Sequence, residues 1–189
     1  MNEPQKNLLV IDTESGGLDP NHQSILSLGA TTLPTTSARE FEVVVREEEI
    51  VAEAEALSVN KFSVDWITAN GKSPREAVRL FEEFLSDCFT NDVQVVIGGH
   101  NTWFDVAFLK RLYRLAERKF PKQLSHRLID TSSIIQFLRY SGKISLKTGS
   151  SDEVFRYFDI EVQDSERHTA LGDARATAKL IEKLSEFVK

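Results

Sequence analysis

The stretch Leu8-Leu9-Val10-Ile11-Asp12-Thr13-Glu14 joins four consecutive apolar residues to two acidic ones. A short apolar run rich in β-branched residues, ended here by Gly16 and Gly17, predicts a buried strand. Residues i and i+2 of a strand face the same side, so Asp12 and Glu14 should project together. Neighbouring carboxylates repel each other unless a cation lies between them, and Mg²⁺ prefers carboxylate oxygens. Alone, the stretch favours a solvated turn; with acidic partners further along the chain, it would indicate a divalent-metal site at the end of a core strand.

The composition is that of a soluble globular protein with one domain. The chain has 189 residues, of which 41% are hydrophobic and 28% are charged. We expect a single domain over residues 1–189, with its core over residues 8–187. The sequence has no apolar run of the roughly 20 residues needed to cross a bilayer, so we expect no membrane contact. The polar stretch Met1–Asn7 predicts no signal peptide, and a single cysteine, Cys88, suits a reducing cytoplasm.

The charge of the chain is negative overall and uneven along its length. A formal net charge of −6 argues against broad binding of duplex nucleic acid, which normally needs a basic face. Between Lys110 and Lys147, however, ten Lys or Arg residues face only two acidic ones, whereas residues 40–92 are rich in acid. This division permits an anionic ligand on one side of the protein, and ordinary solvated helix faces are the alternative.

The order of apolar segments predicts an α/β fold. Residues 24–33 and 41–46 favour strands, and the links between the first three strands are too short for parallel crossovers. We therefore expect an antiparallel meander. Later strands at 93–97 and 128–130 alternate with helical patterns at 73–88, 103–118 and 134–138, and a last helix begins near residue 171. Such alternation is typical of helix-linked strands in a mixed sheet.

Two further motifs carry acidic residues to positions where ligands bind in α/β folds. The motif His100-Asn101-Thr102-Trp103-Phe104-Asp105 follows the strand at 93–97, at the carboxyl edge of the sheet. Asp105 falls in the first turn of a helix, which the helix dipole alone would also favour. The motif His168-Thr169-Ala170-Leu171-Gly172-Asp173 separates its histidine and aspartate by five residues, about 140° net on a helix. We therefore expect His168 in a loop and Asp173 in the first turn of the last helix.

Taken in order, the three motifs resemble those of the DEDDh 3′–5′ exonucleases. This group includes the proofreading subunit of bacterial replicative polymerases and ribonuclease T. The resemblance runs from residue 8 to about residue 185. It implies an RNase H-like mixed sheet, three antiparallel strands followed by helix-linked parallel ones, with helices on both faces.

The resemblance also implies roles for individual residues. Two Mg²⁺ or Mn²⁺ ions would be held by the four acidic residues, and His168 would be the general base. Such an ion pair activates a water molecule and stabilises the leaving oxygen in an in-line displacement. Substrate would contact Thr13, Leu18, Asn101 and Phe104, with Leu18 as the wedge beside the terminal base. The alternatives are that Asn101 caps a helix and that Phe104 belongs to the core. The implied metal ligands are Asp12, Glu14, Asp105 and Asp173.

The sequence thus predicts a metal-dependent 3′–5′ exonuclease. It would release nucleoside 5′-monophosphates from single-stranded 3′ ends of DNA or RNA, with DNA slightly favoured. One alternative on the same scaffold is an RNA-trimming or oligonucleotide exoribonuclease. Another is a nucleic-acid-binding module without catalysis, to which we give little weight because all five motif residues are present. Any polymerase or repair partner and the oligomeric state are left open.

Overall fold

The quoted stretch forms β1, Leu8–Ser15, the central strand of a five-stranded mixed sheet. The computed structural model describes residues 7–187. The strand order is β3-β2-β1-β4-β5, with β1, β2 and β3 antiparallel and β1, β4 and β5 parallel. The expected mixed sheet, a meander followed by helix-linked parallel strands, is confirmed. The other elements are β2 Ile25–Thr32, η1 Thr35–Ser37, β3 Glu40–Val44, α1 Ala54–Val59, α2 Val64–Asn70, α3 Pro74–Cys88, β4 Val95–Gly99, α4 Thr102–Leu115, β5 Leu124–Asp130, α5 Thr131–Tyr140, α6 Ser151–Tyr157 and α7 Ala170–Phe187.

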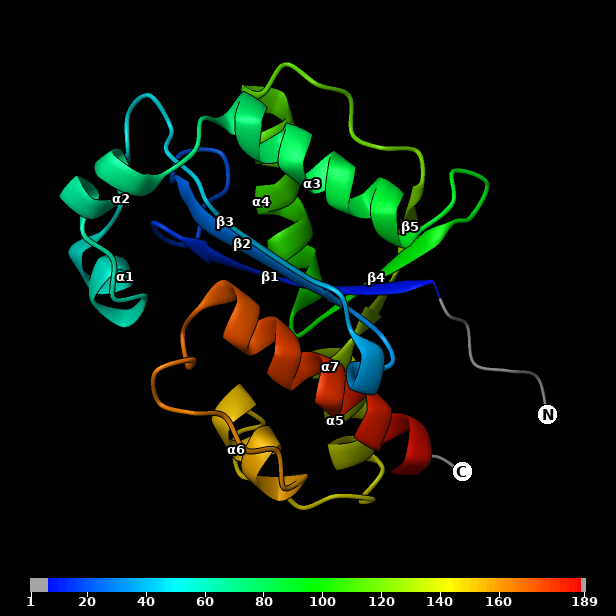
Figure 1. Cartoon of the computed structure of the whole chain (residues 1–189). Helices are drawn as coiled ribbons and strands as arrows, with labels where there is room; N and C mark the ends of the chain where they lie inside the picture. The colour runs from blue at the N-terminus through cyan, green and yellow to red at the C-terminus, as the bar shows by residue number, and fades with distance from the viewer. Residues whose placement is uncertain (1–6, 188–189) are drawn as a thin grey trace.

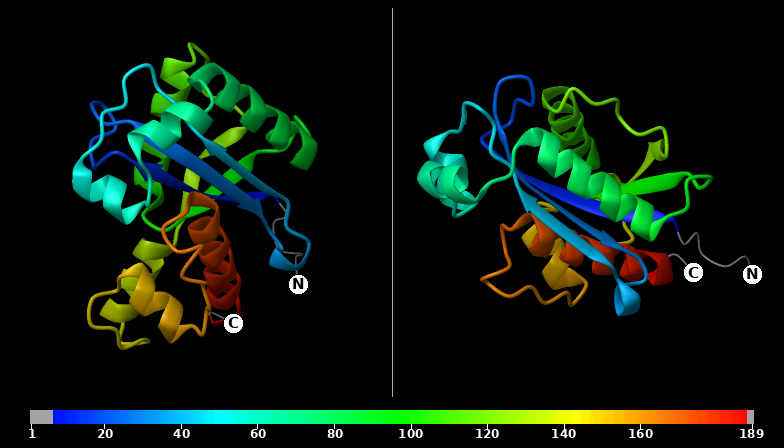
Figure 2. Two further views of the ribbon diagram at one scale, coloured as in Figure 1. Left: turned by 60° about the vertical axis from the view of Figure 1, so that its left-hand side comes forward. Right: turned by 45° about the horizontal axis from the view of Figure 1, so that its top comes forward.

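Helices cover both faces of the sheet. Helices α3 and α4 lie on one face, and α7, α5 and α6 lie on the other (Figure 1). The short helices α1 and α2 lie beside one end of the sheet, and the views in Figure 2 show the same three layers. This arrangement confirms the helices expected on both sides of an RNase H-like sheet.

Residues 8–11 of β1 are all apolar because both faces of the strand are buried there. Leu9 and Ile11 pack in the core under α3 and α4, whereas Leu8 and Val10 pack with Ala178 of α7. A strand covered on both faces reads as a continuous apolar run. The same alternation continues into the polar end of the strand, so Asp12 and Glu14 share the α7 face and Thr13 faces α4.

The structure extends some elements beyond the expected ranges. Strand β5 begins at Leu124 rather than at residue 128. Within residues 7–187 it is an edge strand that pairs only with β4, and it exposes His126 and Arg127. Polar residues at an exposed edge hide the strand from an apolar pattern. In the acidic stretch after β3, a helix forms only from Ala54 onward.

Helix α7 crosses β2 at very close range. A Cβ atom on Gly29 would lie 2.2 Å from the carbonyl carbon of Ala170, the first residue of α7. Only glycine permits this approach, because any side chain would meet helix backbone. The contact places the first turn of α7 beside the carboxyl end of β1.

Within residues 7–187 no helix is both long and apolar enough to span a membrane. The N-terminal residues 1–6, for which we expect no signal peptide, and residues 188–189 lie outside the described part of the chain.

Candidate active site

Three carboxylates meet where β1 ends and α7 begins. Asp12, Glu14 and Asp173 each offer one oxygen atom, and the three oxygens lie within 4.8 Å of one another. Asp12 and Glu14 come together because they alternate with Thr13 along β1, and Asp173 stands in the first turn of α7. A cluster of hard oxygen donors is what Mg²⁺ or Mn²⁺ requires from a protein. The residues present therefore fit a divalent cation.

Asp105 approaches the same strand end from the α4 side and lies outside that group of three. Its buried carboxylate accepts hydrogen bonds from the backbone N–H and the Oγ1 hydroxyl of Thr13, at 2.9 and 2.8 Å. Its charge still raises the pKa of both Asp12 and Glu14. Thr13, expected to contact substrate, thus fixes the orientation of an acidic side chain.

The electrostatics of this cluster favour protons when no cation is present. Burial raises the pKa of Asp12 well above its ordinary value, and the charges of Asp105, Glu14 and Asp173 raise it further. Burial and the charges of Asp173 and Asp105 raise the pKa of Glu14 to about 7. Burial also raises the pKa of Asp105 to about 7, against the opposing hydrogen bonds from Thr13. A bound cation would offset the repulsion and keep the carboxylates ionised.

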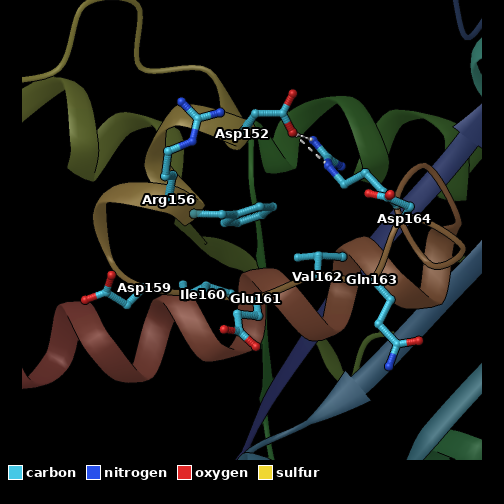
Figure 3. A pocket seen from close by; sticks show the side chains of 10 residues that line it. Asp152, Arg156, Asp159, Ile160, Glu161, Val162, Gln163 and Asp164 are labelled. Carbon is cyan, nitrogen blue, oxygen red and sulfur yellow. Dashed lines mark hydrogen bonds and ion pairs between the residues drawn. The ribbon is translucent and has the colours of Figure 1, made fainter.

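A guanidinium that the motifs do not signal supplies a positive charge inside the cluster. Arg167 Nη1 lies 2.5 Å from both carboxylate oxygens of Asp173. Its Nε donates to Asp152 at 2.8 Å (Figure 3), and its Nη2 donates to Ser151 at 2.7 Å; both residues lie at the start of α6. The guanidinium also lies 5.5 Å from the centre of the Phe155 ring. Arg167 therefore ties α6 to α7 and partly neutralises Asp173, whose pKa burial would otherwise raise further.

His168 lies in the turn before α7, as the spacing of its motif predicts. Its backbone has φ of 60°, in the left-handed region, and the side chain is half-buried. A hydrogen bond from its backbone also stabilises the ionised form of Asp173. Positive φ is uncommon for a residue with a side chain and is found often at functional sites. The backbone contact with Asp173 therefore places this histidine beside the carboxylate cluster.

A hollow of about 350 Å³ opens beside the carboxylates. Its walls include Thr13, Glu14, Leu18 and Phe104, together with residues of α1. Leu18 is 82% exposed, whereas the Phe104 ring packs against Phe108 with 4.9 Å between ring centres. Phe104 is thus both a partner of the core and a wall of the hollow. The size is at the small end of pockets for small molecules.

Asn101 occupies the N-cap position of α4, as the capping alternative expects, but its side chain makes no capping hydrogen bond. Its backbone there has φ of 70°. The start of α4 is held instead by the Asp130 carboxylate, which accepts from the N–H groups of Asn101 at 2.7 Å and Thr102 at 3.3 Å. The same carboxylate caps α5 through Ser132. The Asn101 side chain is left exposed beside the site.

A second hollow, of about 620 Å³, has Arg167 among its lining residues, and Figure 3 shows this hollow from close by. It opens between α6 and residues 159–164, and its walls carry Asp152, Asp159, Glu161 and Asp164. The same walls also carry Arg156 and Arg167, so acidic and basic side chains are mixed around this hollow.

Comparison with known proteins places these residues in a family. The family model described as exonuclease, RNase T, matches residues 9–181. The chain is 27% identical over 184 residues to the "3'-5' DNA exonuclease Cap18" of Escherichia coli, covering 95% of this chain and 93% of that protein. It is 27% identical over 182 residues to a "DNA polymerase III PolC-type" of Latilactobacillus sakei, covering 94% of this chain but only 11% of that polymerase.

Solved structures share the fold at low sequence identity. Exonuclease I of E. coli in complex with a dT13 oligonucleotide superposes with a TM-score of 0.79 at 14% identity, over 96% of this chain and 41% of that one. The nuclease domain of 3'hExo, described as a DEDDh family member bound to rAMP, gives 0.77 at 13% identity, over 98% and 94% of the two chains. Both likenesses concern the fold. Since the family model spans nearly the whole described chain and the three motifs are in place, the protein belongs to the exonuclease family, in its DEDDh group, and is a nuclease.

Proposed function

We propose that the protein is a divalent-metal-dependent 3′–5′ exonuclease that releases nucleoside 5′-monophosphates from single-stranded 3′ ends, with DNA slightly favoured over RNA. The observation that carries this proposal is the meeting of Asp12, Glu14 and Asp173 within 4.8 Å, beside a hollow that Phe104 and Leu18 help to line. Such a hollow is suited to one terminal nucleoside, and the carboxylates lie where its phosphodiester would be held.

The residues of the site would divide the work as follows. Asp12, Glu14, Asp105 and Asp173 would hold two Mg²⁺ or Mn²⁺ ions. Such ions activate the attacking water and stabilise the leaving 3′ oxygen. Thr13 fixes the Asp105 carboxylate through two hydrogen bonds, so that this ligand needs no reorientation.

The remaining side chains would bind substrate and move the proton. His168 would accept the proton of the attacking water, a role that imidazole groups often take as general bases. Leu18, exposed at the rim, would wedge beside the terminal base, with Phe104 as the wall behind it. The exposed Asn101 amide would contact the strand.

The names of the relatives support three parts of this proposal: cleavage in the 3′–5′ direction, DNA as the polymer and a single-stranded substrate. Cap18, which this chain matches over nearly its full length, is called a 3'-5' DNA exonuclease, and exonuclease I was solved with a dT13 oligonucleotide. We place the activity in one domain, with its core over residues 8–187, and in the cytoplasm, on the composition and the single cysteine.

The test is a time course on end-labelled single-stranded DNA and RNA of equal sequence, with Mg²⁺, Mn²⁺ or EDTA. We expect a metal-dependent ladder shortening from the 3′ end, somewhat faster on DNA. Asp12→Asn and Asp173→Asn should abolish the ladder while the fold, measured by circular dichroism, is retained. Asp92→Asn is the matched control, because Asp92 is exposed in the turn before β4, at the opposite edge of the sheet. Near-full activity of either site variant would refute the two-metal assignment.

His168 is tested separately. His168→Ala should lower kcat strongly while the KM for a single-stranded oligonucleotide changes little, because the imidazole acts on water rather than on the strand. An unchanged kcat would remove His168 from the mechanism.

A further inference from the structure

A groove between α4 and β5 lies next to the hollow beside the carboxylates. We propose that this groove binds the nucleotides that precede the scissile bond, with the Trp103 indole as the surface on which a base stacks. The proposal rests on the exonuclease function proposed above and names the part of the substrate that the α4–β5 groove takes.

Trp103 is placed for this role by its position and its exposure. It lies in the first turn of α4, two residues before Asp105, yet 59% of its surface is exposed. Its ring stands edge-on to Phe104, with 6.0 Å between ring centres and 87° between planes. Phe104 faces the hollow beside the carboxylates and Trp103 faces the α4–β5 groove, so the two rings form a wall between them.

The groove has the chemistry of a single-strand site. It measures about 340 Å³, and Trp103, Ala107 and Lys110 line it from one face of α4. Phe120 and Leu128 complete an apolar floor. Single-stranded nucleic acid is bound by flat aromatic surfaces for the bases and by ammonium or guanidinium groups for the phosphates. The α4–β5 groove offers both within one helix face.

The charges on the two sides of the wall formed by Trp103 and Phe104 favour a path for the nucleic-acid strand through the α4–β5 groove. Among the side chains that line the hollow beside the carboxylates, Glu14, Glu53 and Glu55 are acidic and none is basic. Among those that line the α4–β5 groove, Lys110 is basic and none is acidic. Phosphates leaving the metal site are therefore repelled on the side of α1 and attracted on the side of β5.

An extended peptide added to the edge of β5 would be a different occupant of the same place. Within the described residues, β5 pairs only with β4, so its other side is free. Its outward residues are His126, Arg127 and a half-exposed Leu128, and charged side chains on an edge discourage strand addition. The charge and the exposed indole favour nucleic acid.

The first experiment compares a long substrate with one that has no nucleotide before the scissile bond. The long substrate is a single-stranded DNA 10-mer, and the short one is the p-nitrophenyl ester of thymidine 5′-monophosphate. Trp103→Ala should lower the ratio of kcat/KM for the 10-mer to that for the ester about tenfold, through KM, as stacking on one aromatic surface implies. Trp103→Phe should restore most of the ratio. Trp66→Ala, which removes a tryptophan 46% exposed on α2, should leave it unchanged.

The second experiment measures binding in the α4–β5 groove through the fluorescence of Trp103. The chain has two tryptophans, so in a Trp66→Phe variant Trp103 is the sole indole. With Ca²⁺ in place of Mg²⁺ to slow turnover, titration with the 10-mer should quench its fluorescence, and the ester should quench it much less. Fluorescence is read without turnover, so it separates binding from catalysis.

The outcomes distinguish failure of the groove proposal from failure of the proposed exonuclease function. If wild-type protein shortens the 10-mer but Trp103→Ala keeps the ratio and the 10-mer leaves Trp103 fluorescence unchanged, the exonuclease stands and the groove proposal is refuted. If wild-type protein hydrolyses neither substrate with any metal, the proposed function fails and the groove proposal fails with it. Quenching by an acidic peptide but not by the 10-mer would assign the α4–β5 groove to a protein partner and refute our proposal.

Discussion

The guanidinium of Arg167 offsets part of the repulsion among the carboxylates of the site when no metal ion is bound. Asp12, Glu14 and Asp173 lie within 4.8 Å of one another in a largely buried place, where like charges repel strongly. The guanidinium of Arg167 lowers the pKa of all three carboxyl groups, and its planar fork reaches Asp173 and α6 at once. Lysine could not make these contacts together, because its ammonium is a point charge. The same contact competes with a cation for Asp173.

Replacing Arg167 should therefore strengthen metal binding. In Arg167→Gln, Asp173 is freed, and the dissociation constant for Mn²⁺ should fall about fivefold, as for a partly exposed ion pair of about 1 kcal/mol. Isothermal titration of the nucleic-acid-free protein measures this directly. Asp152→Asn is the control, because it weakens the outer partner of Arg167 and leaves the Asp173 contact in place. Equal or weaker Mn²⁺ binding by Arg167→Gln would contradict the competition.

The sequence predicts the acidic residues of the site better than their supports. Asp12 and Glu14 follow from strand alternation, and Asp173 from its place at a helix start. Arg167 and the contact of Asp130 with α4 could not be predicted, because each involves side chains or backbone brought near only by the fold. An aspartate directly before a Thr-Ser-Ser helix start is a capping signal, and it is the one clue that could have identified Asp130.

At the scale of elements, the site depends on how closely α7 lies on β2. Gly29 allows the backbone of Ala170 to approach, and Asp173 follows one turn later. Apolar patterns predict that both elements exist, but they carry no information on the distance between them. The range predicted for β5 is too short because the exposed polar residues of this strand show no apolar alternation.

Adding a methyl group at Gly29 should separate metal binding from the rest of the fold. Gly29→Ala must push the start of α7 away, because the new Cβ would lie 2.2 Å from helix backbone. We expect about 1–3 kcal/mol of lost stability, as for overpacking, and at least tenfold weaker Mn²⁺ binding. Urea unfolding and titration calorimetry measure the two effects.

Gly98→Ala is the matched control, since there the nearest atom is the end of the flexible Ile181 side chain at 3.0 Å. It should cost less stability and leave Mn²⁺ binding intact. Equal losses in the two variants would show that the contact at Gly29 has no special role in placing Asp173.

At the scale of the whole molecule, the sheet separates two apolar layers, and the acidic side chains of the site lie together at one end of it. One core lies under α3 and α4, and another joins α5, α6 and α7. The carboxylates stand where β1, α4 and α7 converge, so their repulsion acts on all three layers. The stability of the molecule should therefore depend on the occupation of this site.

The metal-free protein should lose stability as the pH rises. Glu14 and Asp105 have pKa values raised to about 7 in the folded state, from ordinary values of 4.5 and 3.8. The folded state thus binds these protons more tightly than the unfolded chain does. Their contribution is complete below about pH 4 and is lost as the pH rises through 7. The melting temperature in EDTA should fall by about 5 °C between pH 5 and pH 8.

Divalent cations should reverse this loss. Because Mg²⁺ or Mn²⁺ replaces the protons, the rise in melting temperature on adding metal should be larger at pH 8 than at pH 5. Thermal unfolding at both pH values, with metal and with EDTA, checks both statements. Asp12→Asn should flatten the dependence on pH and on metal. A metal effect that is equal at the two pH values would contradict the assignment of these protons to the site.

The alternation along β1 has a consequence for which sequence changes the protein can tolerate. Asp12 and Glu14 face α7, while Thr13 between them faces α4 and holds Asp105. The function of each residue in the site therefore depends on which face of the strand its position occupies. Inserting or deleting one residue inside the strand would exchange the two sets and turn the acidic groups toward the wrong layer. Length changes near the site should therefore be confined to the loops that flank β1, whatever substitutions the strand itself accepts.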